Sequence, residues 1–390
     1  MMHIGIIEVC ELNHYTAVLA LAETYAVNQE NEIYIFTIES ISTSFNYTDN
    51  RIKLIIKRND QSIADFLKEI SSLCLDRVHI NTISHYYKEF AETDWSGDLY
   101  FTVHNIELWF DNPLSGRVSG LIHGMKESLF KRGINNRFLP LILFIKDFVR
   151  QYYRKVFIRK ISKIKHKILV YSSSQQKYLF RYVEPSNTIV FPFCLYGNLK
   201  DTSIGNPKIR VCIPGSVSDK KRDYSSFFRM LIDNAELFKE KMSIDLLGFI
   251  PESDRHLLTK VKDLQSLGID ISYNLGFITS AEFDIRLAQA DIVLGNLRSA
   301  INLYQRYGET KETGVIFNMI KAGKPGLLPS GYPVDDSLKD MVIPFSDYNH
   351  LLDILRMVVA NSIDLNAFKA KALETAKYYQ PSYLYQSLVD

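Results

Sequence analysis

The sequence predicts an α/β protein of two domains in tandem, each built on a doubly wound parallel sheet. Short apolar, strand-like runs alternate with stretches of helical periodicity along most of the 390 residues. A polar stretch with Gly and Pro, 196–208, interrupts this alternation and is typical of a linker. The alternation then starts again, and a chain of this length can bury two separate cores.

The first half opens with a buried-strand pattern at 3–9 (HIGIIEV), a turn and a helix at 15–27. The other elements expected here are strands and one helix. The strands lie at 32–38, 52–56, 77–83, 99–105 and 167–174, and the helix at 62–73. Strands that alternate with helices indicate a parallel sheet. We assign these elements to an N-terminal domain of residues 1–198.

The second half repeats the pattern. The expected strands are 208–213, 243–249, 269–278, 291–297, 326–329 and 340–345, and the expected helices are 224–238, 252–268, 280–290, 314–322, 348–362 and 365–379. We assign residues 199–374 to a C-terminal domain and expect a helix at about 375–390 to pack back on the first domain. Such a pair is predicted to face a cleft between the carboxyl ends of its two sheets.

The charge is unevenly distributed along the chain. Residues 1–116 carry 7 Lys and Arg against 17 Asp and Glu, whereas residues 117–167 carry 14 against 2. This asymmetry predicts an anionic partner for one surface. Nucleic acid is disfavoured, because the rest of the first domain is acidic.

The cysteines and the apolar runs indicate the cellular location to expect for the protein. The four cysteines lie far apart and form no CxxC pair, which argues against a disulfide or metal framework and fits a reducing cytosol. The N-terminus has early acidic residues and lacks the pattern of a signal peptide. The longest apolar run, 138–145, is shorter than the roughly 20 residues that a membrane span needs. We therefore expect a cytoplasmic location.

A loop at 308–314 leads into the predicted helix 314–322. A helix N-terminus exposes unpaired N–H groups and partial positive charge, which suit an anion. Gly314 would let a phosphate approach the backbone, and Thr310 or Thr313 would cap the helix or donate to the phosphate. Capping by Thr313 alone would account for part of this pattern.

The acidic residues of the same loop, Glu309 and Glu312, could accept hydrogen bonds from sugar hydroxyls. Simple capping does not explain why such a loop follows a sheet strand, where ligands bind.

Two segments of the second half carry a resemblance to a known family. NLGFITSAEFDIRLAQADIVL (274–294) and GVIFNMIKAGKPGLLP (314–329) resemble donor-site segments of GT-B glycosyltransferases. The resemblance is to the retaining, nucleotide-sugar-using group of bacterial polysaccharide biosynthesis. It runs over most of the chain and is specific in the second half. It implies two Rossmann-like domains facing a cleft, with the nucleotide-sugar held by the C-terminal domain and the acceptor by the N-terminal domain.

The family pattern also implies site residues, and here the chain departs from it. The family has two glutamates eight positions apart, and these positions fall on Thr310 and Asn318. Glu312 or Glu309 would then take the role of the first glutamate, and Asn318 could still bond a ribose hydroxyl. This departure places the sequence in a divergent branch.

Other residues of these segments are expected to bind the donor. The loop that would contact the base contains Phe277 and Ile278. Lys311 lies in the loop ahead of the donor-site helix, beside Thr313 and Gly314.

A basic segment, IPGSVSDKKRDYSSF (213–227), resembles the second phosphate-binding segment of the family. Its Gly215 is followed by Lys220, Lys221 and Arg222. A nucleoside diphosphate gains negative charge as the sugar departs, and positioned cations stabilise that charge without a metal. The alternative is a solvated basic turn.

The first domain offers candidates for the acceptor side. His104 and Asn105 end a predicted strand, where ligands bind, and the resemblance implies that His104 lies beside the transferred sugar. Glu8, Glu11 and His14 lie in the segment that leads into the first predicted helix. An inverting enzyme would need one group of this kind as a general base, a retaining enzyme would not, and both remain open. A histidine satisfied by loop carbonyls is the alternative for His104.

Residues 137–167 predict an amphipathic basic helix that begins at Pro140. Its predicted apolar face comprises Ile142, Ile145, Phe148, Val149, Tyr152, Val156 and Phe157, and its predicted basic residues are Lys146, Arg150, Arg154, Lys155, Arg159 and Lys160. Such a helix is typical of a membrane-surface element. A core-packed helix with a solvated basic face is an equal alternative.

Taken together, these features predict a glycosyltransferase that moves a sugar from a nucleotide-sugar to a glycan or polyprenyl-linked acceptor. His104 and Glu312 are its catalytic candidates. A peripheral contact with the anionic inner face of the cell membrane is expected. No Asp-x-Asp motif stands at a predicted strand end, so neither metal nor other cofactor is expected. The alternatives are a nucleotide-sugar epimerase on the same fold and a non-enzymatic nucleotide-sugar-binding module.

Overall fold

A computed structural model describes residues 1–45, 49–110, 139–199, 207–220, 222–298 and 305–389, with the backbone alone for 139–144. The chain divides into two compact units. Unit 1 comprises Met1–Val170 and Leu179–Phe191, and unit 2 comprises Tyr171–Tyr178 and Pro192–Asp390.

Unit 1 is built on a seven-stranded parallel sheet in the order β3-β2-β1-β4-β5-β6-β7. Its strands are β1 (His3–Glu8), β2 (Glu32–Thr37), β3 (Ile52–Ile56), β4 (Arg77–Ile80), β5 (Asp98–Thr102), β6 (His166–Val170) and β7 (Thr188–Val190). The last five residues of β1 are all buried. A strand whose sheet is covered by helices on both faces has a continuous run of apolar residues for this reason.

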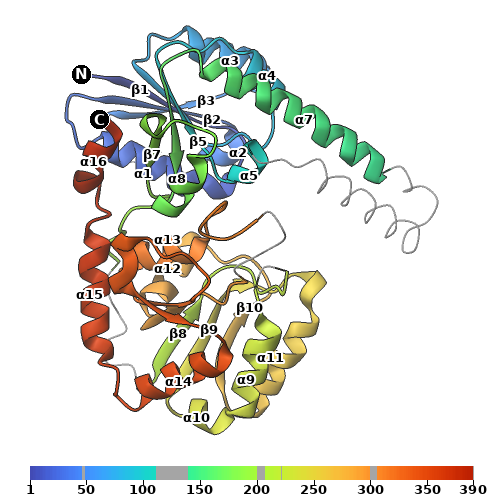
Figure 1. Ribbon diagram of the computed structural model, residues 1–390, viewed down its shortest axis with the longest axis vertical. Coiled ribbons are helices and arrows are strands. Elements are labelled where there is room, and N and C mark those ends of the chain that lie inside the picture. Colours follow the sequence, from blue (N-terminus) through green and yellow to red (C-terminus); the bar gives the residue numbers. More distant parts are fainter. Residues whose placement is uncertain (46–48, 111–138, 200–206, 221, 299–304, 390) are drawn as a thin grey trace. The chain divides into compact units, whose positions relative to one another are not determined.

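Helices cover both faces of this sheet, with α1 on one face and α3, α4 and α7 together on the other (Figure 1). The helical elements of unit 1 are η1 (Leu12–His14), α1 (Tyr15–Tyr25), α2 (Glu39–Ser42), α3 (Ile63–Ser72), α4 (Tyr87–Glu92), α5 (Ile106–Trp109), α7 (Leu139–Ile161) and η3 (Pro185–Asn187). Helix α3 shows why the sequence folds locally as predicted. Its apolar stripe follows an N-cap, Ser62, whose side chain accepts from the backbone N–H of Asp65.

Unit 2 holds a six-stranded parallel sheet in the order β10-β9-β8-β11-β12-β13. Its strands are β8 (Ile209–Ile213), β9 (Met242–Phe249), β10 (Asp270–Asn274), β11 (Ile292–Leu294), β12 (Gly326–Pro329) and β13 (Val342–Phe345). Both sheets are parallel throughout their described pairings, which confirms the predicted fold class of each unit.

The helical elements of unit 2 make two cores, one on each face of the sheet. They are α8 (Ser173–Leu179, whose last residue belongs to unit 1), α9 (Tyr224–Asp233), α10 (Ala235–Lys239), η4 (Glu252–Asp254), α11 (His256–Ser266), α12 (Ser280–Ala288), α13 (Gly314–Ala322), η5 (Asp336–Met341), α14 (Tyr348–Val359), α15 (Leu365–Lys377) and α16 (Pro381–Val389). Helices α9, α11 and α14 bury their apolar stripes in one core. Helices α12, α13 and α15 contribute to the other.

Each sheet has one position where the strand order reverses. In unit 1 it lies between β1 and β4, and in unit 2 between β8 and β11. The loops that leave such a pair of strands diverge to opposite faces of the sheet and open a crevice at their carboxyl ends. These two edges are therefore where each unit is expected to bind ligands.

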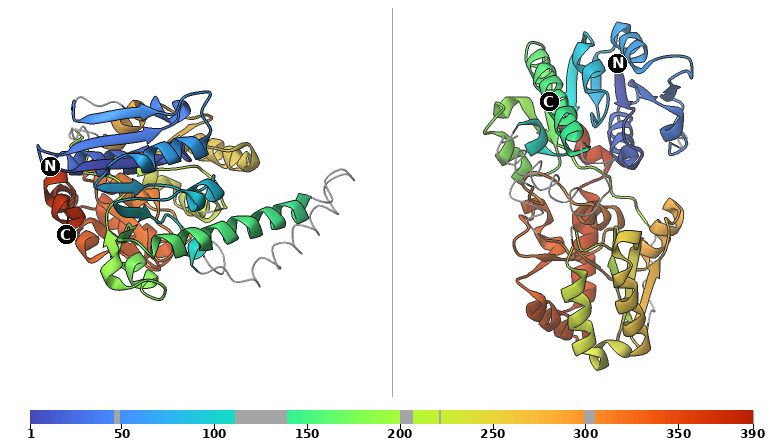
Figure 2. Two further views of the ribbon diagram at one scale, coloured as in Figure 1. Left: turned by 90° about the horizontal axis from the view of Figure 1, so that it is seen from above. Right: turned by 90° about the vertical axis from the view of Figure 1, so that its right-hand side faces the viewer.

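Helix α7 differs from its prediction. It packs against α4, and its N-terminal part runs beyond the sheet of unit 1 (Figure 2). Phe157 of the predicted apolar face is buried with Ile161. Arg154, which was predicted on the basic face, is also buried and donates to the carbonyl O of Leu108 and the hydroxyl of Tyr87. The C-terminal half of the helix therefore faces the core of the unit, which fits the core-packed alternative there, and the contact with a membrane stays a prediction.

The exposed apolar side chains of α7 lie ahead of Arg154, in the N-terminal part of the helix. Ile145, Phe148, Val149 and Tyr152 are 47–60% exposed. Ile142 of the predicted apolar face has no described side chain. No helix in the described part of the chain is long and apolar enough to cross a membrane.

Candidate functional site

The carboxyl edge of the unit 2 sheet brings together two loops that are distant in the sequence. One loop follows β8 and the other follows β11. A backbone bridge joins Arg222 of the first loop to Leu297 of the second. The Nε of Arg298 donates to the carbonyl O of Arg222 at 3.0 Å. The basic segment predicted from the sequence is thus held at the position where the strand order reverses.

Gly215 and Arg222 fit closely within this edge. Gly215 has φ of +92°, and a Cβ there would lie 2.6 Å from Nη2 of Arg222. That Nη2 donates to the carbonyl O of Pro214. Arg222 is 8% exposed, and its Nη1 has no hydrogen-bond partner among the described residues. A buried donor without an acceptor costs about 1–3 kcal/mol, and an anion beside Nη1 would remove that cost.

Three other basic residues, Lys220, Lys221 and Arg298, lie close to Arg222 in the sequence or in the fold. Lys220 is exposed, and Lys221 lies outside the described residues. Arg298, whose side chain is 49% exposed, was not predicted. It follows a buried strand without any motif, and only the backbone bridge between the two loops brings it beside Arg222.

The N-terminus of α13 is open. The helix begins at Gly314, as predicted, and the side chain of its N-cap Thr313 accepts from the backbone N–H of Val315 at 3.3 Å. Gly314 is exposed, and a Cβ there would meet no described atom within 4 Å. The first turn of α13 can therefore be approached by a ligand.

The loop ahead of α13 is braced from within. Thr310 is 1% exposed, and its Oγ1 accepts from the backbone N–H of Arg306 at 3.1 Å. The backbone N–H of Gly308 donates to the carbonyl O of Lys311 at 2.7 Å. Thr310 thus supports the turn, and its predicted contact with a ligand, like that of Lys311, stays a prediction.

Glu312 is buried at the end of this loop. Its Oε1 accepts from the backbone N–H of Thr313 at 2.8 Å and from the hydroxyl of Tyr332. The hydroxyl of Ser172 bonds to the same carboxylate. Burial raises the pKa of Glu312 to about 7, and these hydrogen bonds oppose the shift. Glu309, the other candidate for the first glutamate, is 40% exposed and lies 3.6 Å from Nη1 of Arg306.

Three further residues predicted to bind a donor lie on unit 2. The Nδ2 of Asn318 donates to the carbonyl O of Gly314 at 2.7 Å and so stabilises the first turn of α13. Phe277 is 87% exposed, and its ring centroid lies 4.3 Å from that of Phe249. Ile278 packs against the core below α12 and α13. An exposed aromatic pair of this kind suits stacking with a nucleobase, which stays a prediction.

At the carboxyl edge of unit 1, Glu8 is fully buried at the end of β1. Its Oε1 accepts from the backbone N–H groups of Cys10 and Glu11 at 2.9 and 3.0 Å, and its Oε2 accepts from Nδ2 of Asn81 at 2.6 Å. Burial raises the pKa of Glu8 to about 7, against these bonds and one from Thr82. Glu8 was predicted, with Glu11 and His14, as a group that could act as a general base, and this role stays a prediction; its full burial is a finding of the structure.

Two histidines of unit 1 that the sequence places 90 residues apart form a pair. The rings of His14 and His104 stack with centroids 4.0 Å apart and an interplanar angle of 9°. Thr82 Oγ1 lies 2.8 Å from Nδ1 of His14 and 3.0 Å from Nε2 of His104. That Nε2 is also 2.8 Å from the carbonyl O of Asn81. Because a carbonyl only accepts, this nitrogen of His104 carries the proton.

The remaining residues predicted on the acceptor side lie at the same edge. Glu11 is partly exposed in the loop after β1. Asn105 precedes α5, and its Oδ1 is buried without a hydrogen-bond partner among the described residues. The structure thus brings Glu11, His14, His104 and Asn105 to one edge of unit 1, as the sequence predicts. Their contact with an acceptor stays a prediction.

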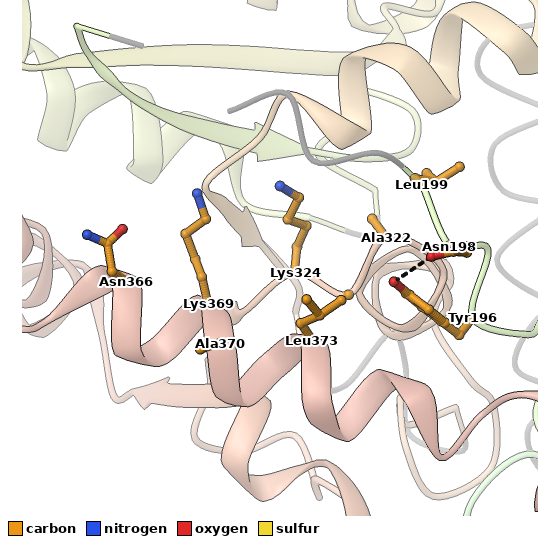
Figure 3. A pocket seen from close by; sticks show the side chains of 10 residues that line it. Tyr196, Asn198, Leu199, Ala322, Lys324, Asn366, Lys369, Ala370 and Leu373 are labelled. Atoms are coloured by element: carbon orange, nitrogen blue, oxygen red, sulfur yellow. Dashed lines mark hydrogen bonds between the residues drawn. The ribbon is translucent and has the colours of Figure 1, made fainter. Parts of the chain in front are cut away.

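Figure 3 shows a pocket of unit 2 that lies away from the predicted site. It has a volume of about 590 Å³. Tyr196, Lys324 and Lys369 are among its lining residues, and the ammonium ends of the two lysines point the same way. Lys324 precedes β12, and Lys369 pairs with Asp291 ahead of β11 at 2.9 Å. The pocket therefore belongs to the amino edge of the sheet, opposite to the edge where ligands are expected.

Carboxylates, histidines and cysteines do not gather as a metal site anywhere in the described residues. No protein-family model and no curated protein sequence matches the chain.

Solved structures do match the chain over its full length. HepE from Anabaena, solved with UDP and glucose, has a TM-score of 0.60 at 13% identity and covers 100% of this chain and 98% of its own. TarM gives a TM-score of 0.63 at 10% identity, with the same coverage of 100% and 98%. A glycosyltransferase from Rickettsia africae gives 0.58 at 11% identity, with 100% and 99% covered. At such low sequence identities the similarity is evidence for the fold alone. Together with the two parallel sheets described above, it shows that this chain has the GT-B fold.

Proposed function

We propose that the chain is a glycosyltransferase that moves a sugar from a nucleotide-sugar donor to a hydroxyl of a glycan or lipid-linked acceptor in cell-surface polysaccharide synthesis. The observation that carries the proposal is the buried guanidinium of Arg222, whose Nη1 lacks an acceptor among the described residues. A diphosphate oxygen would satisfy it with a charge-assisted hydrogen bond. The structures of HepE with UDP and with UDP-glucose support a nucleotide-sugar as the ligand.

Two features of unit 2 would stabilise the negative charge of the leaving diphosphate. Arg222 and Arg298 lie on one loop pair, and the open first turn of α13 lies on another. Fixed cations and a helix N-terminus stabilise developing negative charge in the transition state. We therefore propose a transfer that needs no metal.

The acceptor would be bound by unit 1. His14 and His104 expose part of their rings at the edge where the strand order reverses. Imidazole nitrogens and the nearby carboxylate of Glu11 suit hydroxyl groups of a saccharide. We propose these three residues, with Asn105, as the acceptor site.

Helix α7 would bring unit 1 to the inner face of the cell membrane. Phe148 and Tyr152 are 59% and 60% exposed, and Lys146 and Arg150 in the same part of the helix are exposed as well. Aromatic side chains bury in the headgroup region while basic residues draw anionic lipids. A lipid-linked acceptor would lie at the same surface.

The proposal is tested in two steps. A thermal-shift panel of UDP, GDP, ADP and CDP identifies the base, since a ligand at 100 times its Kd stabilises by about 2.7 kcal/mol. The corresponding nucleotide-sugars are then incubated with the protein, with and without EDTA. A transferred sugar, or slow release of nucleoside diphosphate without an acceptor, supports the proposal. An epimerised sugar indicates an epimerase, and binding without any product indicates a sensing module.

A further inference from the structure

Glu312 fastens the loop 305–313, here called the donor loop, to two other segments of unit 2. The Oε1 of Glu312 accepts from the backbone N–H of Thr313 and from the hydroxyl of Tyr332. The hydroxyl of Ser172 bonds to the same carboxylate. Thr313 in turn caps α13 through Val315. The carboxylate of Glu312 therefore helps to fix where the first turn of α13 begins.

Ser172 has one hydroxyl proton and two acceptors. Besides the carboxylate of Glu312, the carbonyl O of Gly308 lies 3.5 Å from its Oγ. An ionised carboxylate is the stronger acceptor, so it takes the Ser172 proton. A protonated Glu312 can instead donate to Ser172, and Ser172 can then donate to Gly308. The protonation of Glu312 thus decides whether Ser172 bonds to the end or to the start of the donor loop.

The donor loop has little slack with which to absorb this change. Gly308 has φ of +82°, and a Cβ there would lie 2.7 Å from the ring of Pro333. The start of the loop is thus packed against the segment that also carries Tyr332. A change of hydrogen bond at Glu312 is therefore passed to Thr313 and Gly314 rather than lost in a flexible turn.

Four other titratable groups act on Glu312 or feel its charge. Burial raises the pKa values of Tyr307, Tyr332 and Tyr379, so all three stay neutral at pH 7. Burial also acts to raise the pKa of Asp335, but hydrogen bonds from Ser173 and Ser337 outweigh it and keep Asp335 ionised. Among these groups, Glu312 changes its charge near neutral pH.

We propose that Glu312 is a positioning residue of the donor site, and that binding of the nucleotide at Gly314 is coupled through Thr313 to protonation of Glu312. The inference rests on the proposed donor site. Diphosphate oxygens at Gly314 and an ionised carboxylate two residues away repel each other, and both draw on N–H groups of the same turn. Nucleotide binding therefore favours the protonated form of Glu312.

The sign of the pH dependence follows. The pKa of Glu312 is higher with nucleotide bound than without it, so the protein takes up a proton on binding. By linkage, the affinity is greatest below the pKa of the free protein and falls as the pH rises through the pKa of the complex. Each unit of difference between the two pKa values changes the dissociation constant about tenfold.

The test is isothermal titration calorimetry near pH 7.5 in two buffers of different ionisation enthalpy. The probe is the nucleoside diphosphate that the panel of UDP, GDP, ADP and CDP shows to bind. Proton uptake by Glu312→Gln is subtracted from that of the wild type, which removes the titration of the ligand itself. We expect a positive remainder, and a wild-type dissociation constant that rises between pH 6 and 8.5 while that of Glu312→Gln stays nearer its pH 6 value.

Four results keep the inference separate from the proposed function and from simple unfolding. Glu312→Gln keeps the acceptor for Thr313 and Tyr332, so it should still bind nucleotide and should resemble the wild type at low pH. Glu236→Gln, an exposed control on α10, should keep the full proton uptake. Binding with equal proton uptake in the wild type and Glu312→Gln would overturn the inference alone. Failure of all four nucleotides to bind would overturn the proposed function and this inference with it.

Discussion

A Cβ atom at position 215 would lie 2.6 Å from Nη2 of Arg222, at a backbone φ of +92°. The positive φ and the close approach of Arg222 thus each favour glycine at this position. The close approach involves the guanidinium group that we propose to bind the diphosphate. We expect Gly215→Ala to displace Arg222 and to weaken nucleoside diphosphate binding by about tenfold or more, since a charge-assisted hydrogen bond contributes about 1.5–3 kcal/mol.

A control variant separates backbone strain from the displaced guanidinium. Gly268 has φ of +83°, and a Cβ there would meet only the flexible side chain of Lys239, at 3.4 Å. Gly268→Ala should therefore show the strain of a positive φ, about 1–2 kcal/mol of stability, with unchanged nucleotide affinity. Equal affinities of the two variants, measured by calorimetry, would contradict the role of Gly215.

Gly314→Val should abolish donor binding and leave the fold intact. The added side chain would stand over the first turn of α13, where phosphate oxygens must reach the backbone N–H groups. Its Cβ meets no described atom within 4 Å, so the melting temperature should change little. Unchanged nucleotide affinity in a folded Gly314→Val protein would remove this turn from the site.

Glu8→Gln should change the pH dependence of unit 1 stability. Burial raises the pKa of Glu8 to about 7 from 4.5. The folded-state pKa lies above the unfolded value, so this contribution to stability is complete below pH 4.5 and is lost as the pH rises through 7. The free energy of unfolding of the wild type should fall, relative to that of Glu8→Gln, by up to about 3 kcal/mol over this window.

The measurement can be confined to unit 1. Both tryptophans of the chain, Trp95 and Trp109, lie in unit 1, so tryptophan fluorescence in urea at pH 5 and pH 8 reports its unfolding. Glu236→Gln on unit 2 serves as the control. A difference between Glu8→Gln and the wild type that does not vary with pH would show that Glu8 titrates normally.

Replacing Lys146, Arg150, Lys155 and Arg159 of α7 together by Gln should release the protein from anionic vesicles. These four side chains are exposed, and each basic residue near such a surface contributes about 1 kcal/mol. Co-sedimentation at low and high salt measures the shift, while nucleotide binding should stay unchanged. If the wild-type protein does not bind anionic vesicles even at low salt, a soluble acceptor is indicated instead.

Arg154 and Lys160 are excluded from that variant for structural reasons. Arg154 is buried against Tyr87 and Trp109, and Lys160 pairs with Asp94 at 2.7 Å. Arg154→Gln should lower the stability of unit 1, which tryptophan fluorescence would detect.

The sequence predicted the parts of the fold in which apolar residues recur at a regular spacing. Long apolar runs and capped helices, such as β1 and α3, lie where the pattern places them. The three-residue strand β7 (Thr188–Val190) was missed, whereas α16 (Pro381–Val389) lies within the helix expected at about 375–390. A three-residue strand is too short to show a period, and tertiary packing sets the ends of such elements.

The candidate site was predictable to the extent that it follows a motif or a helix start. The start of α13 at Gly314 and the basic segment before α9 come from local sequence. The stacking of His14 on His104 and the closeness of Arg298 to Arg222 come from strand order, which brings distant loops together. The packing of residues 375–390 on the first domain stays a prediction.

The central claim is that unit 2 binds a nucleoside diphosphate through the buried guanidinium of Arg222. Calorimetry with the best nucleotide of the panel, on wild type and on Arg222→Gln, tests it most directly, with Arg255→Gln as a control whose side chain is 72% exposed. We expect the affinity to fall at least tenfold in Arg222→Gln and to stay unchanged in Arg255→Gln. A folded Arg222→Gln protein that binds nucleotide as tightly as the wild type would contradict the account.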